Sequence, residues 1–148
     1  LYFTHNHQHL DLDTQQNHRA LRTTSDLLFK GALKGNSLTV WQGMIIAEPG
    51  AQKTDGFQAN RNLILDNLAR ADSIPGLEIK ANDLRCTHAA TVGRIDDTEL
   101  FYLMSRGIPL HDATKIIVDG FFDPLMQRIP FEGVRERLQL SIDTKMEE

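Results

Sequence analysis

Apolar and polar residues alternate in short stretches along the chain as far as position 95. A period of two residues is typical of β-strands, because successive side chains of a strand point to opposite faces. The predicted strands lie at 4–12, 37–41, 44–46, 62–65, 77–80 and 83–86, with Gly43 interrupting the second and third. Turn-forming residues separate the strands, at 34–36, 48–50, 54–56, 74–76 and 81–83.

Many short strands with close spacing are typical of a β-sandwich, a β-barrel or a β-solenoid. The sequence contains no strict repeat, so periodicity leaves these three folds open. The chain begins at Leu1 rather than at a methionine, and we expect it to come from the middle of a longer protein. A solenoid tolerates such a division because each coil mainly contacts its neighbours. We therefore expect stacked coils with an open N-terminal end that exposes apolar side chains.

Apolar residues recur at spacings of three and four from Asp96 onward, which predicts helices. The sequence 96–99 is typical of a helix N-terminus, and Gly107 of a C-terminal stop. A second helix is predicted from Pro109, with a kink or restart at Pro124, and a third after Pro130. The chain thus divides into a strand-rich region, 1–95, and a small helical domain, 96–148.

The predicted buried stripes of the later helices follow from the same spacing. In the second helix the stripe is Ala113, Ile116, Ile117 and Phe121. In the third helix it is Phe131, Val134 and Leu138. The last residues, from Thr144, are expected to fray.

Composition excludes several classes of protein. Hydrophobic residues make up 41% and charged residues 24% of the 148 residues, as in ordinary globular domains. The net charge of −4 provides no basic surface for nucleic acid. No apolar run approaches the ~18 residues of a membrane span. The single cysteine, Cys86, excludes an internal disulfide and fits a reducing compartment.

Cys86 and His88 are the sharpest candidates for metal chemistry. Two residues apart on one strand, they would share a face with Cα atoms roughly 6.5–7 Å apart. A thiolate and an imidazole at that spacing can reach one metal ion, and thiolate suits iron–sulfur chemistry. Two ligands do not complete a site, so a partner chain, a substrate or a second copy would supply the others. Alternatively, Cys86 packs beside Leu84 as a small hydrophobe and His88 makes a local hydrogen bond.

His5, His7 and His9 form a second candidate, because alternation would place all three on one strand face. This set would suit a stand-alone β-fold metalloprotein resembling the cupins. A cupin needs a further histidine and a glutamate at spacings that are absent here, and a solvated strand face is the favoured interpretation.

Several separated motifs resemble the SufB/SufD family of iron–sulfur cluster assembly scaffolds. The strongest are the sequences 77–93 (LEIKANDLRCTHAATVG) and 100–108 (LFYLMSRGI). Shorter matches precede them at 24–26, 30–31, 53–56, 60–63 and 72–75. SufB-like chains carry a cysteine near the position of Arg61 and a Glu-His-Glu sequence within 85–89. This chain has neither, so it resembles the SufD branch.

This resemblance implies a right-handed parallel β-helix, of which the chain would hold the C-terminal coils, followed by a helical C-terminal domain. It implies a non-catalytic scaffold that pairs with a SufB-like scaffold through the β-helix and docks a SufC-like ATPase through the helices. ATP-driven movement of the ATPase would reshape the SufB–SufD interface. Without a SufB-like partner, a homodimer is the open alternative. The implied location is the cytoplasm, or the plastid stroma for a plant protein.

The resemblance also implies roles for individual residues. His88, with Cys86, would bind iron or a nascent cluster transiently at the partner interface, and no cofactor would be held stably. Docking residues are expected on the helices: Phe101, Tyr102, Arg106, Phe121 and Phe122. Arg106 also complements the dipole of the first helix, and at least one of the two adjacent phenylalanines is expected in the core.

Overall fold

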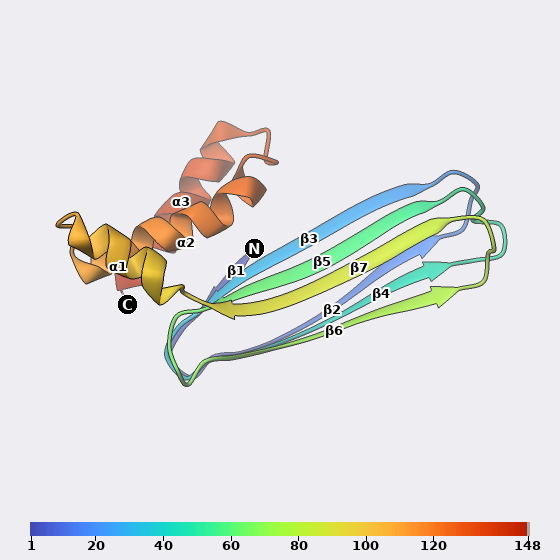
Figure 1. The fold of residues 1–148 in the computed structure, drawn as a ribbon. Coiled ribbons are helices and arrows are strands. Elements are labelled where there is room, and N and C mark those ends of the chain that lie inside the picture. Colours follow the sequence, from blue (N-terminus) through green and yellow to red (C-terminus); the bar gives the residue numbers. More distant parts are fainter. Residues whose placement is uncertain (148) are drawn as a thin grey trace.

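Seven strands and then three helices follow one another along residues 1–147, the part of the chain that the computed structural model describes (Figure 1). The strands are β1 (Tyr2–Thr4), β2 (His9–His18), β3 (Thr24–Leu33), β4 (Leu38–Ala47), β5 (Asp55–Ile64), β6 (Arg70–Ile79) and β7 (Arg85–Arg94). The helices are α1 (Asp97–Ser105), α2 (Leu110–Met126) and α3 (Glu132–Glu147).

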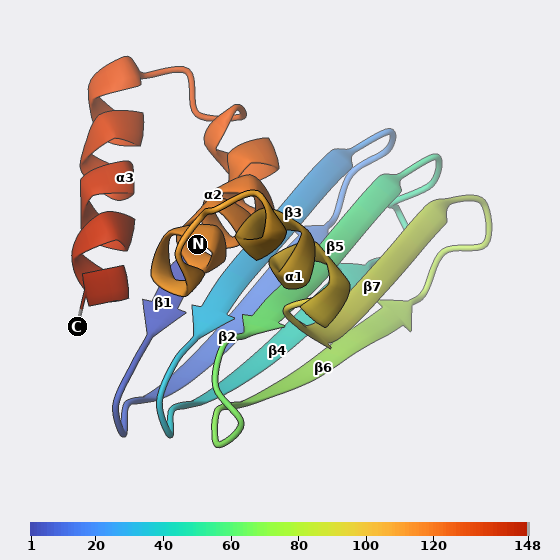
Figure 2. The ribbon, with the colours of Figure 1, turned by 60° about the vertical axis from the view of Figure 1, so that its left-hand side comes forward.

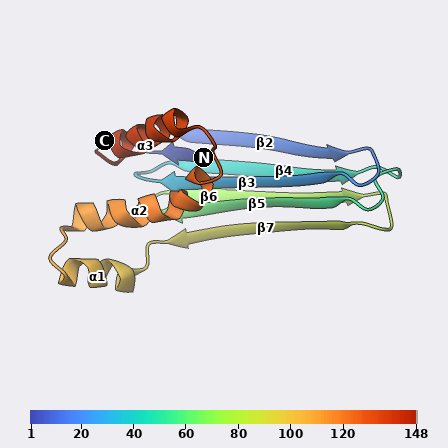
Figure 3. The same ribbon diagram turned by 90° about the horizontal axis from the view of Figure 1, so that it is seen from above.

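The strands form a parallel β-helix. Odd-numbered strands make one sheet in the order β1-β3-β5-β7, and even-numbered strands make the other in the order β2-β4-β6. Every recorded pairing is parallel. His9 lies beside Leu38 and Leu38 beside Arg70, so successive coils are 29 and 32 residues apart. Figure 3 shows the coils stacked side by side. The β-helix implied by the resemblance is confirmed, whereas periodicity alone had left a sandwich or barrel open.

Several strand boundaries differ from the prediction. Gly43 continues β4 instead of interrupting it, paired with Thr14 on β2 and Pro75 on β6. A side chain does not fit at this position, because a Cβ would come within 2.3 Å of the Trp41 ring. The predicted turns at 54–56 and 74–76 lie largely or wholly inside β5 and β6. Pro75 is tolerated because β6 is an edge strand, paired only with β4. Residues at 4–12 form two strands joined by a turn rather than one.

Polar side chains tie the two sheets together inside the coils. The buried Gln58 carboxamide donates to the carbonyl oxygens of Gly43 (3.2 Å) and Gly76 (3.1 Å) across the interior. A second network links Tyr2, Asn60, Asn62 and Ser73. Buried polar groups of this kind are costly unless paired, so these networks favour one register between the coils.

The change from strands to helices falls between Arg94 and Asp97, at the predicted boundary between residues 95 and 96. Asp96 caps α1 by accepting a hydrogen bond of 2.7 Å from the Thr98 amide. Gly107, with φ of 88°, follows the end of this helix in the left-handed conformation that glycine adopts at low cost. Pro124 neither ends nor restarts α2, which continues to Met126.

The buried stripes of the helices agree with the prediction in part. Ala113 is buried, and Ile117, Phe121 and Leu138 are partly buried and pack against the core. In α2 the buried residues are Ala113, Val118, Phe122 and Met126, whereas Ile116 is exposed. In α3 they are Ile142 and Met146, whereas Phe131 and Val134 are exposed. Apolar residues occupy more than one face of each helix, so spacing could not select the buried one. The predicted fraying is wrong as far as Glu147, since α3 continues there; Glu148 lies outside the described residues.

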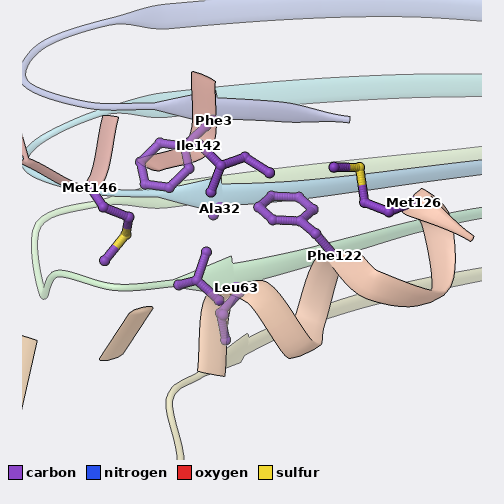
Figure 4. Close-up of a cluster of buried hydrophobic side chains, with 8 residues drawn as sticks. Phe3, Ala32, Leu63, Phe122, Met126, Ile142 and Met146 are labelled. Atoms are coloured by element: carbon purple, nitrogen blue, oxygen red, sulfur yellow. The ribbon is translucent and has the colours of Figure 1, made fainter. Parts of the chain in front are cut away.

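One apolar core joins the helices to the strands. Figure 4 shows its members converging from β1, β3, β5, α2 and α3. They are Phe3, Ala32, Leu63, Val118, Phe122, Met126, Ile142 and Met146. Figure 2 shows the helices gathered at one end of the β1-β3-β5-β7 sheet. The N-terminal coil is open as expected, since β1 and β2 each end their sheet. Tyr2 and Phe3 are buried, however, contrary to the expectation that this end exposes apolar side chains.

We expect Phe122→Ala to lower the free energy of unfolding by about 3–5 kcal/mol, because it leaves a cavity in this core. Urea denaturation would measure the change. Phe101→Ala is the matched control: Phe101 is 71% exposed, and its loss should change stability by less than about 0.5 kcal/mol. Equal effects of the two substitutions would contradict the assignment of the core.

Candidate functional site at the last coil

The last coil, β6 with β7, is uncovered on its outer side. Each of these strands ends its sheet and has a neighbour on one side only within residues 1–147. Val92 on β7 is the register partner of Asn62 on β5. Asn62 is only 3% exposed, whereas Val92 is 49% exposed. Leu77 and Ile79 on β6 are likewise the register partners of Ile45 and Ala47 on β4. Ile45 and Ala47 are fully buried, whereas Leu77 and Ile79 are exposed. Positions that face the interior in earlier coils are therefore accessible in this one.

Cys86 and His88 both lie on β7 of this coil, as the sequence predicted. Their register partners on β5 are Gly56 and Gln58, which are buried. The two side chains therefore belong to an inward-facing row of the last coil. Cys86 is half-buried and His88 is exposed, and His88 makes no hydrogen bond with the described residues. A thiol and an accessible imidazole thus share one face next to the uncovered edge.

The Cys86 thiol lies in a small space that Gly56 leaves open. A Cβ at Gly56 would come within 3.0 Å of Cys86 Sγ and 3.4 Å of His18 Nε2. Burial raises the pKa of Cys86, partly offset by a hydrogen bond from the Gly56 backbone, and the carboxylate of Asp55 raises it further. The thiol is therefore protonated at neutral pH, and binding a metal ion must release its proton.

The sequence did not single out His18, which lies near Cys86 although 68 positions separate them. Its two ring nitrogens are engaged, Nδ1 with Thr23 Oγ1 at 2.7 Å and Nε2 with Ser25 Oγ at 2.8 Å. Because both nitrogens have partners and the ring is buried, His18 is held as a structural group rather than presented as a ligand. Only the pairing of coils, which a single sequence without a repeat does not reveal, brings it here.

No cluster of three or more histidine, cysteine, aspartate or glutamate side chains suited to a metal ion occurs within residues 1–147. Cys86 and His88 therefore provide two donors at most. A complete tetrahedral site would need two further ligands from outside the described chain.

The three histidines near the N-terminus do not share a strand face, which corrects the prediction. β1 ends at Thr4 and β2 begins at His9. Asn6 adopts a φ of 55° within a turn closed by a hydrogen bond from the Gln8 amide to the His5 carbonyl. The histidines alternate in the sequence although a turn, not a strand, holds His5 and His7. The shared strand face that the cupin-like alternative needs is therefore absent.

The expected docking residues divide into exposed and buried members. Phe101 and Tyr102 are exposed on α1, a helix without a buried residue, and Arg106 lies over the Tyr102 ring at 5.1 Å. Phe121 is half-buried against Lys30, whereas Phe122 is 1% exposed and belongs to the core. An open apolar depression adjoins Tyr102 and is lined by Thr98, Glu99, Leu103 and Ile117.

The fold is a parallel β-helix of two sheets followed by three helices, and comparison with known proteins specifies the family. Residues 1–121 match the model of the SufBD core domain, described as SUF system FeS cluster assembly. The chain therefore belongs to the SufBD family and is SufD-like. No helix within residues 1–147 combines the length and apolar character needed to cross a membrane.

Named relatives agree with this assignment. An iron–sulfur cluster assembly SufBD family protein of Mycobacterium tuberculosis is 41% identical over 99% of this chain and 39% of its own length. The iron–sulfur cluster assembly protein SufD of Escherichia coli is 38% identical over 92% of this chain and 32% of its own length. The iron–sulfur cluster assembly protein SufD of Bacillus subtilis is 37% identical over 90% of this chain and 30% of its own length. The chain thus spans two fifths or less of these relatives.

The raised pKa of Cys86 gives a direct prediction. Alkylation of the folded chain by iodoacetamide should have its midpoint at a higher pH than alkylation of the same chain unfolded in urea, because only the thiolate reacts. Mass spectrometry would follow the reaction, and the single cysteine makes its assignment unambiguous. A midpoint below that of the unfolded chain would contradict a desolvated thiol.

Proposed function

We propose that this chain is the SufD-like part of a scaffold complex for iron–sulfur cluster assembly and performs no turnover of its own. The SUF description of the matched family and the SufD relatives support the process. The uncovered last coil supports the scaffold role, because it offers a surface that a second protein can complete.

The uncharged edge of β7 is the observation that carries this proposal. Eight consecutive residues, from Cys86 to Gly93, carry no charge when His88 is neutral. Monomeric proteins usually protect exposed edge strands with charges, prolines or bulges, since a bare edge recruits other strands. An edge with eight consecutive uncharged residues between Arg85 and Arg94 therefore suits strand-to-strand pairing with another β-helix. The proposed partner is a SufB-like scaffold.

Cys86 and His88 have a role in this pairing because they lie on the strand that meets the partner. Each can contribute one donor, and the SufB-like protein would contribute the others, so that iron or a nascent cluster is bound only in the complex. The metal is cargo in this scheme and leaves with the finished cluster. A neutral imidazole suits transient binding, because one ring nitrogen is free to coordinate while the other takes a hydrogen bond.

The helix α1 is the proposed docking element for a SufC-like ATPase. Phe101 and Tyr102 present aromatic surface there beside an open apolar depression, and aromatic residues in such positions often dominate binding energy. The β7 edge and the α1 surface are formed by different segments, so one chain could hold both partners at once.

Val92→Lys and Phe101→Glu should separate the two binding surfaces. A lysine at position 92, the eighth of the ten residues of β7, should abolish co-purification with the SufB-like protein and preserve that of the SufC-like ATPase. Phe101→Glu should do the reverse, so each variant is the control for the other. Circular dichroism would establish that both are folded. Retention of the SufB-like protein by Val92→Lys would contradict the proposed edge. Size measurement of the isolated chain tests whether the same edge forms a homodimer.

His88→Ala should lower the cluster content of the assembled complex while leaving the thermal midpoint of the isolated chain nearly unchanged. The imidazole is exposed and has no hydrogen-bond partner among the described residues, so its removal leaves no buried group unpaired. Iron and sulfide would be measured after anaerobic purification. His7→Ala, in the exposed turn, is the matched control. A large fall in midpoint with normal cluster content would show that His88 is structural.

A further inference from the structure

A cleft of about 600 Å³ lies between the end of the β-helix and the helices. Residues of β5 and β7, of the turns that follow β3 and β5, and of all three helices line it. Its volume is within the range of about 300–1,000 Å³ that small-molecule sites occupy, and such sites are often found where two structural units meet. The size and place of the cleft therefore suit a small ligand.

Apolar side chains form one part of the lining. Ile64 and Met146 are buried and belong to the two apolar clusters of the protein. Leu110, at the start of α2, also lines the cleft but is 54% exposed. A ligand with an aliphatic body would remove this leucine surface from water, which is favourable.

Two cations in the lining lack a carboxylate partner. Lys34 donates a hydrogen bond to the backbone carbonyl of Met146 at 2.8 Å, and Arg94 donates one to the side-chain oxygen of Asn67. Neither lysine nor arginine forms an ion pair with any residue of the described range, 1–147. Since an ammonium has three N–H donors and a guanidinium five, both keep donors for a ligand.

Arg94 occupies a position that earlier coils fill with aliphatic residues. Its register partner on β5 is Ile64, and that of Ile64 on β3 is Leu33. Leu33 and Ile64 are buried, whereas Arg94 is exposed beside the cleft. A polar residue at the open end of a solenoid can serve solubility alone, so Arg94 needs a test that separates solubility from binding.

The acidic residues of the lining restrict the charge of the ligand. Asp66 accepts a hydrogen bond of 2.6 Å from the Gly35 amide. Asp97 lies in the first turn of α1, where the helix dipole favours a carboxylate. Both carboxylates would repel a doubly charged phosphate more strongly than a singly charged carboxylate.

We propose that this cleft binds a small molecule that carries a carboxylate on an aliphatic body. Arg94 and Lys34 donate to the carboxylate, which a guanidinium can hold through two parallel hydrogen bonds. The aliphatic body covers Leu110. The lining includes neither residues 86–92 of the β7 edge nor Phe101 and Tyr102, so this site is separate from both surfaces of the proposed function and does not depend on them.

Hexanoate is a suitable probe, because hexanol and hexylamine have the same chain length without the negative charge. Methyl NMR of the chain should show saturable shifts at Leu100, Leu110 and Met146 on addition of hexanoate. Leu21, in the exposed turn at the other end of the coils, should not shift. Hexanol and hexylamine should bind about tenfold more weakly or worse, the loss expected for hydrogen bonds to a charged group.

Arg94→Gln should weaken hexanoate binding about tenfold or more for the same reason. Arg61→Gln is the matched control: Arg61 is exposed on β5 outside the cleft, and its loss changes the net charge equally. Leu110→Ser should also weaken binding, and a thermal midpoint for each variant would establish that it is folded. The proposal is overturned if hexanoate shows no saturable binding, if hexanol binds as tightly, or if Arg94→Gln and Arg61→Gln bind hexanoate alike.

Discussion

Parallel pairing between coils is the constraint on which the other features of this chain depend. Each strand pairs with a strand 29 to 32 residues away, and the pairing keeps one register along ten-residue strands. Equivalent positions of successive coils therefore lie in rows, and a residue in a row is covered by the residue of the next coil. Ile45 and Ala47 are fully buried for this reason, and Leu77 and Ile79 in the last coil are not.

The polar interior adds specificity to this stack. A coil with only aliphatic side chains inside could shift along its neighbour at modest cost, because hydrophobic contacts are not directional. Gln58 must meet the carbonyl groups of Gly43 and Gly76, and Asn60 must meet Tyr2 and Ser73. A shift of register would leave these buried groups unpaired, so the networks disfavour it. The same register brings His18 near Cys86 and places His88 beyond the buried Gln58.

The helices and the uncovered edge use different parts of the same sheet. α2 and α3 cover the end of β1, β3 and β5 through an apolar core, and lysine side chains within and just after β3 reach their backbone carbonyl groups. β7 is the last member of that sheet and keeps its outer edge exposed within the described residues. The helices and the exposed edge of β7 are therefore joined through one sheet.

The sequence by itself determined the local features of this protein. The change of period near position 95, the cap at Asp96, the glycine after α1 and the common face of Cys86 and His88 all follow from residues close together in the chain. The family also followed from the sequence, through separated motifs. These inferences succeeded because caps, turns and strand alternation are set by a few neighbouring residues.

Only the tertiary structure decided which residues are covered. His5, His7 and His9 alternate in sequence, yet a turn at Asn6 separates them. Ile116 and Phe131 have the spacing of buried residues, yet they are exposed, whereas Val118 and Ile142 are buried. The approach of His18 to Cys86 and the exposure of the last coil also depend on which coils pair. Burial is a property of the elements that fold over a residue, and local spacing carries no information about segments 30 or more residues away.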